Sequence, residues 1–275
     1  MDPLSKKVII IISIFAVLLI GFIIFYLSFI SSKTISARLL VEKEKVFVND
    51  KEVFGEQILS EKDKVFVSET GSATIILYES VVVILESGTT IIVEELAEKK
   101  SELFQESGGT WSQFTKLFGI ESYSIKTSTS VASVRGTGFY LNDSLIFVGE
   151  GEVDYDVNDK SFVVEEEKAM EKFGELFRER DMTPEEKEKV KLNKLEVIKS
   201  LKKLRLLEIA KHQKTFDFLK KKYDFTDEDV SSYLEKVDKG EVSLEDLRDK
   251  SPIEIGAISK IIEITEKIKE INSSI

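Results

Sequence analysis

The stretch 127-TSTSVASVRGTGFYLNDSLIFVGEGEVDYDV-157 decides the fold class of this chain. It holds two extended runs, 130–141 and 145–157, separated by the turn-prone Asn142-Asp143-Ser144. At the end of the second run the apolar residues Val153, Tyr155 and Val157 alternate with acids, as in a strand with one buried face. The stretch therefore predicts antiparallel β structure.

Two glycines interrupt the first run. Gly136 and Gly138 flank Thr137 within a strand pattern, where glycine marks a bulge or a close approach of another backbone. Arg135 beside them is the only charge between residues 126 and 143. Because an unpaired buried charge is costly, we expect this guanidinium to be held by backbone carbonyls or by Glu150, as a structural anchor.

The sequence motifs around these glycines resemble the end of a FecR-type domain. They are Val134-Arg135-Gly136-Thr137-x-Phe139 and Val148-x-Glu150-Gly151-x-Val153. Upstream motifs occur in the order expected for such a domain: Gly55-Glu56-Gln57-Ile58, Thr70-Gly71-Ser72-Ala73, a strand pair at 74–85, Ser87-Gly88-Thr89, Gly108-Gly109-Thr110-Trp111 and Thr127. The resemblance covers residues 39–164. It implies a β module placed outside the cytoplasm, whose motif residues Arg135, Gly136, Thr137, Phe139, Glu150, Gly151 and Val153 serve the fold.

Composition narrows the class of protein. The 275 residues are 42% hydrophobic and 32% charged, which indicates a folded chain. There is no cysteine, so disulfides and cysteine-type zinc sites are excluded. The net charge of −11, carried largely by residues 39–164, disfavours a general nucleic-acid-binding surface. An acidic body suits cationic partners.

Residues 8–30 carry no charge and are almost wholly apolar. As a helix they would be about 34 Å long, enough to cross a bilayer. We predict a seven-residue tail (1–7), a transmembrane helix (8–30) and a linker (31–38). A cleaved signal peptide is the alternative, but Ile35-Ser36-Ala37 is a poor cleavage site. Lysines flank both ends of the span almost equally, so the FecR resemblance decides the expected orientation: N-terminus cytoplasmic, body outside.

Residues 39–164 show short β-branched runs joined by turns, at 46–48, 51–54, 65–67, 74–78, 81–85 and 89–93. The turn pair Asn49-Asp50 separates the first two. This spacing predicts an antiparallel β-sandwich of jelly-roll-like type. Two segments within it have helix-favouring composition, 96–106 and 111–118, and we expect helical turns there.

After residue 164 the sequence is rich in Lys, Glu and Leu. We predict a connecting helix over 165–182 and a helical bundle over 183–275. Thr183-Pro184-Glu185-Glu186 is a strong helix start, for a helix to about residue 222 with one apolar stripe. Thr226 begins a second helix, which Gly240 ends. A short helix is expected at 244–248, and a last one from Ser251-Pro252 to about Ile271. The stripe residues are Val190, Val197, Leu201 and Leu204.

No motif predicts a catalytic, cofactor-binding or metal-binding residue, and we predict that the protein is not an enzyme. Asp154, Asp156, Asn158 and Glu165 have the spacing of a calcium loop, but Asp159 stands where that loop needs glycine. The solvent face of a strand explains these acids better. The single histidine, His212, has no recognisable catalytic partner and is expected at the surface.

The helix expected over 187–222 holds 13 basic and 4 acidic residues. It forms either a face for nucleic acid or anionic lipid, or a solvated face that complements acidic helices at 227–229 and 241–249. We favour the second, because no aromatic residues alternate with most of the lysines.

These observations favour a membrane-anchored interaction or scaffold protein outside the cytoplasm, binding a protein or cell-envelope component. Better-known FecR proteins carry a sizeable anti-sigma segment before the membrane span. Seven residues precede it here, so sigma-factor regulation does not carry over. One alternative is the inverted topology, with a cytoplasmic bundle whose basic helix binds nucleic acid or lipid. Another is an enzyme acting on envelope polymers. The ligand and the oligomeric state are not predicted.

Overall fold

A computed structural model describes residues 37–43, 45–97, 99–117, 120–134, 136–158, 160–174, 176–224, 226–242 and 256–275. Two compact units divide the chain, Met1–Ile35 and Ser36–Ile275. The tail predicted at 1–7, the transmembrane helix at 8–30 and most of the linker at 31–38 lie outside the described residues. Across the described residues, no helix is long and apolar enough to span a bilayer.

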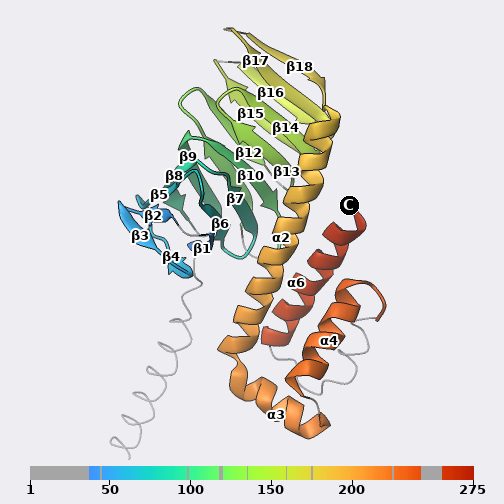
Figure 1. Ribbon diagram of the computed structural model, residues 1–275. Helices are drawn as coiled ribbons and strands as arrows, with labels where there is room; N and C mark the ends of the chain where they lie inside the picture. The colour runs from blue at the N-terminus through green and yellow to red at the C-terminus, as the bar shows by residue number, and fades with distance from the viewer. Residues whose placement is uncertain are drawn as a thin grey trace, which may run out of the picture. The chain divides into compact units, whose positions relative to one another are not determined.

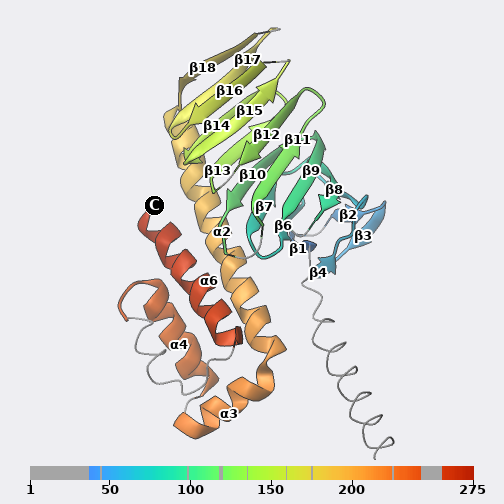
Figure 2. The same ribbon diagram turned by 180° about the vertical axis from the view of Figure 1, so that it is seen from behind.

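The second unit is built on two nine-stranded sheets (Figures 1 and 2). Their pairs are antiparallel except for the parallel pair β9–β11. Sheet A has the order β18 (Leu176–Asp181), β17 (Lys168–Phe173), β14 (Leu145–Glu150), β13 (Gly138–Asn142), β10 (Gly109–Phe114), β7 (Val81–Leu85), β6 (Ser72–Leu77), β1 (Ala37–Lys43), β4 (Glu56–Ile58). Sheet B has the order β16 (Lys160–Glu165), β15 (Glu152–Val157), β12 (Ser130–Val134), β11 (Ser122–Lys126), β9 (Lys100–Ser107), β8 (Thr90–Leu96), β5 (Lys64–Val67), β2 (Val46–Val48), β3 (Lys51–Val53).

The chain builds both sheets together by alternating between them. Hairpins β6–β7, β13–β14 and β17–β18 lie in sheet A, and hairpins β2–β3, β8–β9, β11–β12 and β15–β16 lie in sheet B. Each sheet order therefore follows the sequence closely, which corrects the jelly-roll-like topology. The runs 130–141 and 145–157 are likewise not single strands, because each crosses from one sheet to the other at its glycine.

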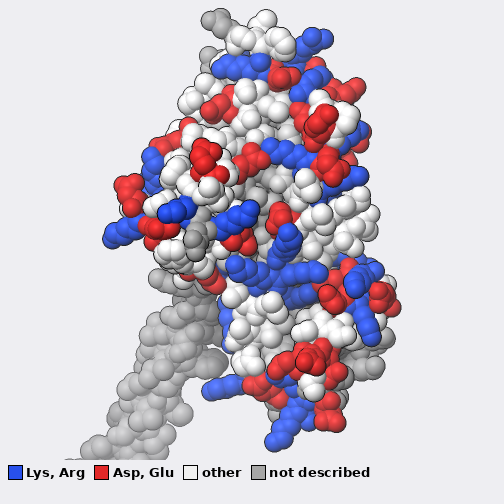
Figure 3. Space-filling model, viewed as in Figure 1, with Lys and Arg blue, Asp and Glu red and all other residues white. Residues whose placement is uncertain are grey.

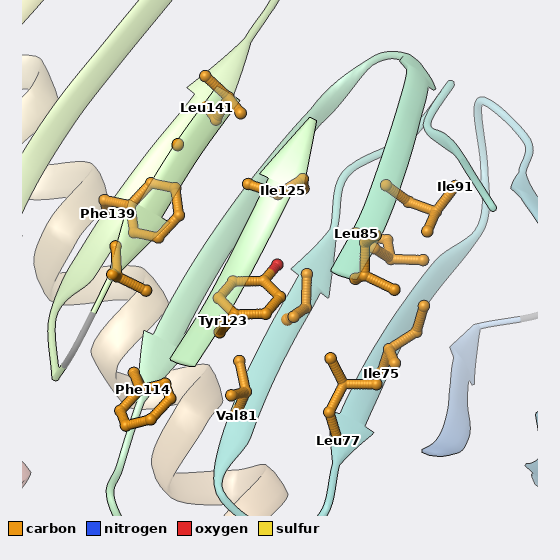
Figure 4. Packing of buried hydrophobic residues seen from close by; sticks show 14 of the residues in the cluster. Ile75, Leu77, Val81, Leu85, Ile91, Phe114, Tyr123, Ile125, Phe139 and Leu141 are labelled. Atoms are coloured by element: carbon orange, nitrogen blue, oxygen red, sulfur yellow. The ribbon is translucent and has the colours of Figure 1, made fainter. Parts of the chain in front are cut away.

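A hydrophobic core fills the space between the sheets (Figure 4). Phe139 and Leu141 of sheet A and Tyr123 and Ile125 of sheet B contribute fully or almost fully buried side chains. In β15, buried Val153, Tyr155 and Val157 alternate with exposed acids, as predicted. The mainly β fold and its sandwich arrangement are confirmed.

Three segments expected to be helical are strands. The segment 96–106 runs from the end of β8 into β9, and 111–118 begins in β10. The predicted connecting helix at 165–182 is the hairpin β17–β18, which turns at Gly174 with φ +62°. In each case burial against neighbouring strands outweighs a helix-favouring composition, because propensity is weaker than tertiary context. The β structure thus extends from residue 37 to 181, beyond the predicted 39–164.

The described helices are α2 (Pro184–Lys211), α3 (Gln213–Tyr223), α4 (Asp227–Asp238) and α6 (Gly256–Ser273). Capping boxes confirm both predicted starts: Thr183 pairs with Glu186, and Thr226 with Asp229. The helix predicted to reach residue 222 is two helices, because the backbone leaves the helical region at His212 (φ −111°, ψ 27°). Gly240 follows α4 with φ +74°. The helix predicted at 244–248 and the start at Ser251-Pro252 lie outside the described residues.

A second core joins α2 and α6 to the outer face of sheet A. The predicted stripe of α2 is buried in it: Val190, Val197, Leu201 and Leu204. Sheet A contributes Trp111, Tyr140 and Phe147, among others, and α6 contributes Ile264, Ile268 and Ile271. Sheet A is therefore covered on both faces, by sheet B and by helices (Figures 1 and 2).

Candidate functional site at the contact between sheet A and helix α2

The predicted motif residues divide between the core and two crossovers from one sheet to the other. Phe139 and Val153 are fully buried in the core between the sheets. Gly136 and Thr137 connect β12 to β13, and Gly151 connects β14 to β15. Arg135 lies outside the described residues, so its proposed anchors remain a prediction.

The two crossovers pack directly against each other. Gly151 has φ +76°, and a Cβ there would lie 2.9 Å from Thr137 Cγ2 and 3.2 Å from the Gly136 carbonyl oxygen. The same close packing of a glycine against a threonine occurs earlier in the chain, where a Cβ on Gly108 would lie 2.4 Å from Thr89 Cα. Gly88-Thr89 and Gly136-Thr137 therefore each lie where the chain passes from one sheet to the other. In both places the glycine of a second crossover packs against the threonine.

The next glycines make room for helix α2. The register of β13 and β14 shifts between Gly138 and Phe139, and the extra residue is Gly149 of β14. A bulge was one of the two outcomes expected at Gly136 and Gly138, and it lies on the facing strand. On the bulged strand, a Cβ at Gly149 would lie 2.6 Å from Val190 Cγ1 and 2.9 Å from Trp111 Cη2. The motif therefore supplies a flat site on sheet A, and α2 lies there with Val190 against the sheet backbone.

A polar cluster lies beside this contact: Gln113, Glu150, Lys194 and Ser274, called here the Glu150 cluster. Gln113 Nε2 donates to Glu150 Oε2 at 3.2 Å, across Gly138, which pairs with both residues in the sheet. Since Gly138 has no side chain, the two can meet. Lys194 is buried, with its Nζ 3.9 Å from Glu150 Oε2 and donating to Ser274 Oγ at 2.9 Å.

Four buried polar atoms near this contact have no hydrogen-bond partner among the described residues. They are Trp111 Nε1, Gln113 Oε1, Thr137 Oγ1 and Asn193 Nδ2. Three of these residues come from strands or crossovers of the motif, and Asn193 comes from α2. Sequence reasoning found Thr137 and Glu150 but missed Gln113 and Lys194. The signal available in the sequence was the pair Gly138 and Gly149. Glycines in neighbouring strands leave space on the sheet, and the apolar stripe of a later helix can pack into that space.

Ion pairs extend the contact toward both ends of α2. Lys189 Nζ lies 2.6 Å from Glu86 Oε1 and 3.7 Å from the centre of the Tyr140 ring, and the Tyr140 hydroxyl donates to Glu86 Oε2 at 2.9 Å. Burial, and then the nearby Glu86 charge, raise the pKa of Tyr140 well above its usual range. The hydroxyl therefore stays a donor at physiological pH.

At the other end, the buried carboxylate of Glu79 in the β6–β7 turn binds both helices of the second core. Lys211 Nζ of α2 lies 3.4 Å from Oε1, and Lys260 Nζ of α6 lies 2.9 Å from Oε2. Lys211 also donates to Glu208 Oε2 at 2.8 Å. His212, expected as a free surface residue, is partly exposed with Nε2 3.5 Å from Glu208 Oε1.

The bundle has one fully buried ion pair among the described residues. Arg205 of α2 donates to both carboxylate oxygens of Asp238 on α4, at 2.7 and 2.9 Å, and to Thr265 Oγ1 of α6 at 3.0 Å. This pair fixes the relative positions of the three helices. These contacts join the helices to one another and to sheet A.

The calcium-loop acids lie as a strand face would place them. Asp154 and Asp156 are exposed on β15, opposite the buried Val153 and Tyr155. Asp159 lies outside the described residues. Among the residues that are described, no group of three His, Cys, Asp or Glu side chains is arranged to hold a metal ion.

Comparison with known proteins gives a weak structural likeness. No family profile matches the sequence, and no curated protein does. Two crystal structures described as "a putative anti-sigma factor from Parabacteroides distasonis ATCC 8503", at 2.50 Å and 1.65 Å resolution, are similar in part. In each case the identity is 16%, the alignment covers 43% of this chain and 59% of that chain, and the TM-score is 0.38. The match spans less than two thirds of those chains.

Proposed function

We propose that this protein is a membrane-anchored scaffold outside the cytoplasm, in which the β-sandwich carries a fixed helical arm (α2, α3, α4 and α6) that binds a protein or cell-envelope partner. The observation that carries the proposal is the attachment of α2 along sheet A. It is held by a continuous apolar core and by ion pairs at both ends, Lys189 with Glu86 and Lys211 with Glu79. An arm whose first helix is attached to the sheet from Lys189 to Lys211 presents its outer surfaces in a constant orientation, as a scaffold requires.

The attachment can be measured by hydrogen exchange of the full chain. If the arm is fixed, the α2 amides around Val197 and Leu201 exchange as slowly as those of β13 and β14, because both open in one cooperative step. Exchange of α2 at least 100-fold faster than β13 would show an arm that detaches from the sheet, and would refute the scaffold proposal.

Anchoring and orientation rest on the uncharged run 8–30 and on the FecR resemblance. They can be tested cleanly because the chain has no cysteine. Ser128 lies in the exposed β11–β12 turn, and Ser232 lies on the exposed face of α4. The variants Ser128→Cys and Ser232→Cys therefore each place one accessible thiol on the body of the protein. In intact cells a membrane-impermeant maleimide should label both variants. Labelling of both only after lysis would establish the inverted topology, and recovery of both in the soluble fraction would refute the anchor.

A further inference from the structure

Helix α2 has a third face that neither sheet A nor α6 covers. Leu192, Leu195 and Leu206 are 55%, 42% and 59% exposed there. They belong to a row with alternating spacings of four and three residues, called here the α2 seam: Glu188, Leu192, Leu195, Lys199, Lys202, Leu206 and Ile209. This spacing is that of the contact positions of a helix pair. After the terminal Glu188, the seam has apolar residues on either side of a cationic centre.

The length of the seam fits a partner helix. Leu192 and Leu206 are 14 residues apart, which is about 21 Å along a helix. A partner of five to six turns would place apolar side chains on both leucine groups while its centre faces Lys199 and Lys202. Exposed leucines at regular seam spacing are otherwise a liability in a soluble surface.

The centre of the seam has a surplus of positive charge. Lys202 Nζ lies 3.2 Å from Asp238 Oδ2, but that carboxylate is already paired in a bidentate manner with Arg205. Lys199 forms an exposed pair with Glu196 at 2.6 Å, which contributes little to stability. Three cations, Lys199, Lys202 and Arg205, thus share two carboxylates, and a carboxylate brought to the centre by a partner would balance the surplus of one positive charge.

The same charges disfavour a second copy of this chain. Antiparallel pairing of two seams about their midpoint places Lys199 against Lys199, and parallel pairing repeats that conflict at Lys202. Like charges in facing positions are destabilising, whereas acids at those positions are favourable. The overall charge of −11 likewise disfavours an anionic membrane as the occupant.

We propose that the α2 seam is the docking surface for an amphipathic helix of a partner protein, with apolar residues at both ends of its contact face and acidic residues at the centre. The inference rests on the proposed scaffold function and names the surface of the arm that binds.

The test uses the full chain and two designed 21-residue helical peptides. Both have leucine at the outer contact positions, and the two central positions are Glu in one peptide and Lys in the other. Fluorescence anisotropy should show the Glu-centred peptide binding at least tenfold more tightly. Lys199→Glu should reverse that preference. Leu206→Ser should weaken binding at least fivefold, whereas the matched variant Leu176→Ser, at a 66%-exposed leucine on the β17–β18 hairpin, should not.

Equal affinity for the two peptides, or no binding of either at about 1 mM, would overturn the proposal. Light scattering that shows a dimer lost in Leu206→Ser would assign the seam to a second copy instead. Binding to phosphatidylglycerol vesicles lost in the same variant would assign it to a membrane. Leu206→Ser should leave hydrogen exchange as in the original chain, and added to the Ser128→Cys and Ser232→Cys variants it should leave their maleimide labelling unchanged. Failure here is therefore separable from failure of the scaffold proposal.

Discussion

Replacing Gly149 by alanine should detach α2 locally from sheet A. The backbone of Gly149 does not lie in the left-handed region, so alanine meets no backbone strain, and the effect is purely one of space. Its Cβ would lie 2.6 and 2.8 Å from the two Val190 methyl groups and 2.9 Å from Trp111 Cη2. Overpacking of this kind costs about 1–3 kcal/mol.

The size of the effect can be isolated with a second substitution. Val190→Ala removes the two methyl groups that lie closest, at a cost of about 2 kcal/mol from lost burial and the cavity left behind. In the double variant the new alanine Cβ occupies part of that cavity. The double variant should therefore lose about 2 kcal/mol instead of the roughly 4 kcal/mol expected if the two costs were independent.

The assay is thermal and urea unfolding followed by Trp111 fluorescence. Trp111 is the only tryptophan of the chain, it is buried, and it lies in the contact being tested. Each single variant should lower Tm by about 4–8 °C. Val163→Ala, at a valine that is 52% exposed, is the matched control and should change Tm little. A Gly149→Ala chain as stable as the original, or a double variant whose loss equals or exceeds the sum, would refute the role given to this glycine.

Three further predictions concern single buried groups. Arg205→Leu should lower the free energy of unfolding by about 3 kcal/mol, because it leaves the Asp238 carboxylate buried, and Arg205→Leu/Asp238→Leu should lose less; urea titration decides. Burial raises the pKa of Glu186, but hydrogen bonds from Arg180 outweigh it and hold that pKa below its ordinary 4.5. The stability from Glu186 is therefore complete above pH 4.5 and lost as the pH falls through the lowered pKa, so a Tm–pH profile of Glu186→Gln should be flatter below pH 4.5. Thr137→Val should keep or raise Tm, because it removes a buried hydroxyl without a partner among the described residues; a fall above 4 °C would show that the hydroxyl is bonded.

Turns and helix starts were predicted correctly, because each depends on a few residues that are adjacent in the sequence. The turn at Asn49-Asp50 has both residues at positive φ, and the capped starts at Thr183 and Thr226 are present as expected. The hairpin β17–β18 was missed because its Glu- and Lys-rich sequence favours helix. Burial of Ala169 and Met170 on the two faces of β17 stabilises the strand form instead, and only Gly174 marked the turn.

The division of a run between two sheets is harder to predict. An alternating pattern continues through a crossover, because both halves of the run still direct apolar side chains into the same core. Gly151 was recognised as part of a motif, but its neighbour in space is Thr137, fourteen residues earlier. Contacts of that kind depend on the sheet order, which no local pattern contains.

The basic character of α2 has a specific cause, and basic and acidic side chains lie interspersed on the face of the molecule shown in Figure 3. Its lysines pair with carboxylates of the acidic sandwich: Lys187 with Glu167, Lys189 with Glu86, Lys194 with Glu150, Lys203 with Glu42 and Lys211 with Glu79. The predicted complement was the acidic helices at 227–229 and 241–249. Lys220 does pair with Asp227, residues 243–249 lie outside the described part of the chain, and the β domain is a complement that was not predicted. Each exposed pair contributes at most about 1 kcal/mol, but together they set the register of α2 along the sheet. A face for nucleic acid would need these same lysines unpaired. What remains outside the pairing with the β domain is the centre of the α2 seam, where Lys199 and Lys202, with Arg205 beside them, face only the carboxylates of Glu196 and Asp238. A partner selected by charge should therefore meet the arm there, between the exposed leucines.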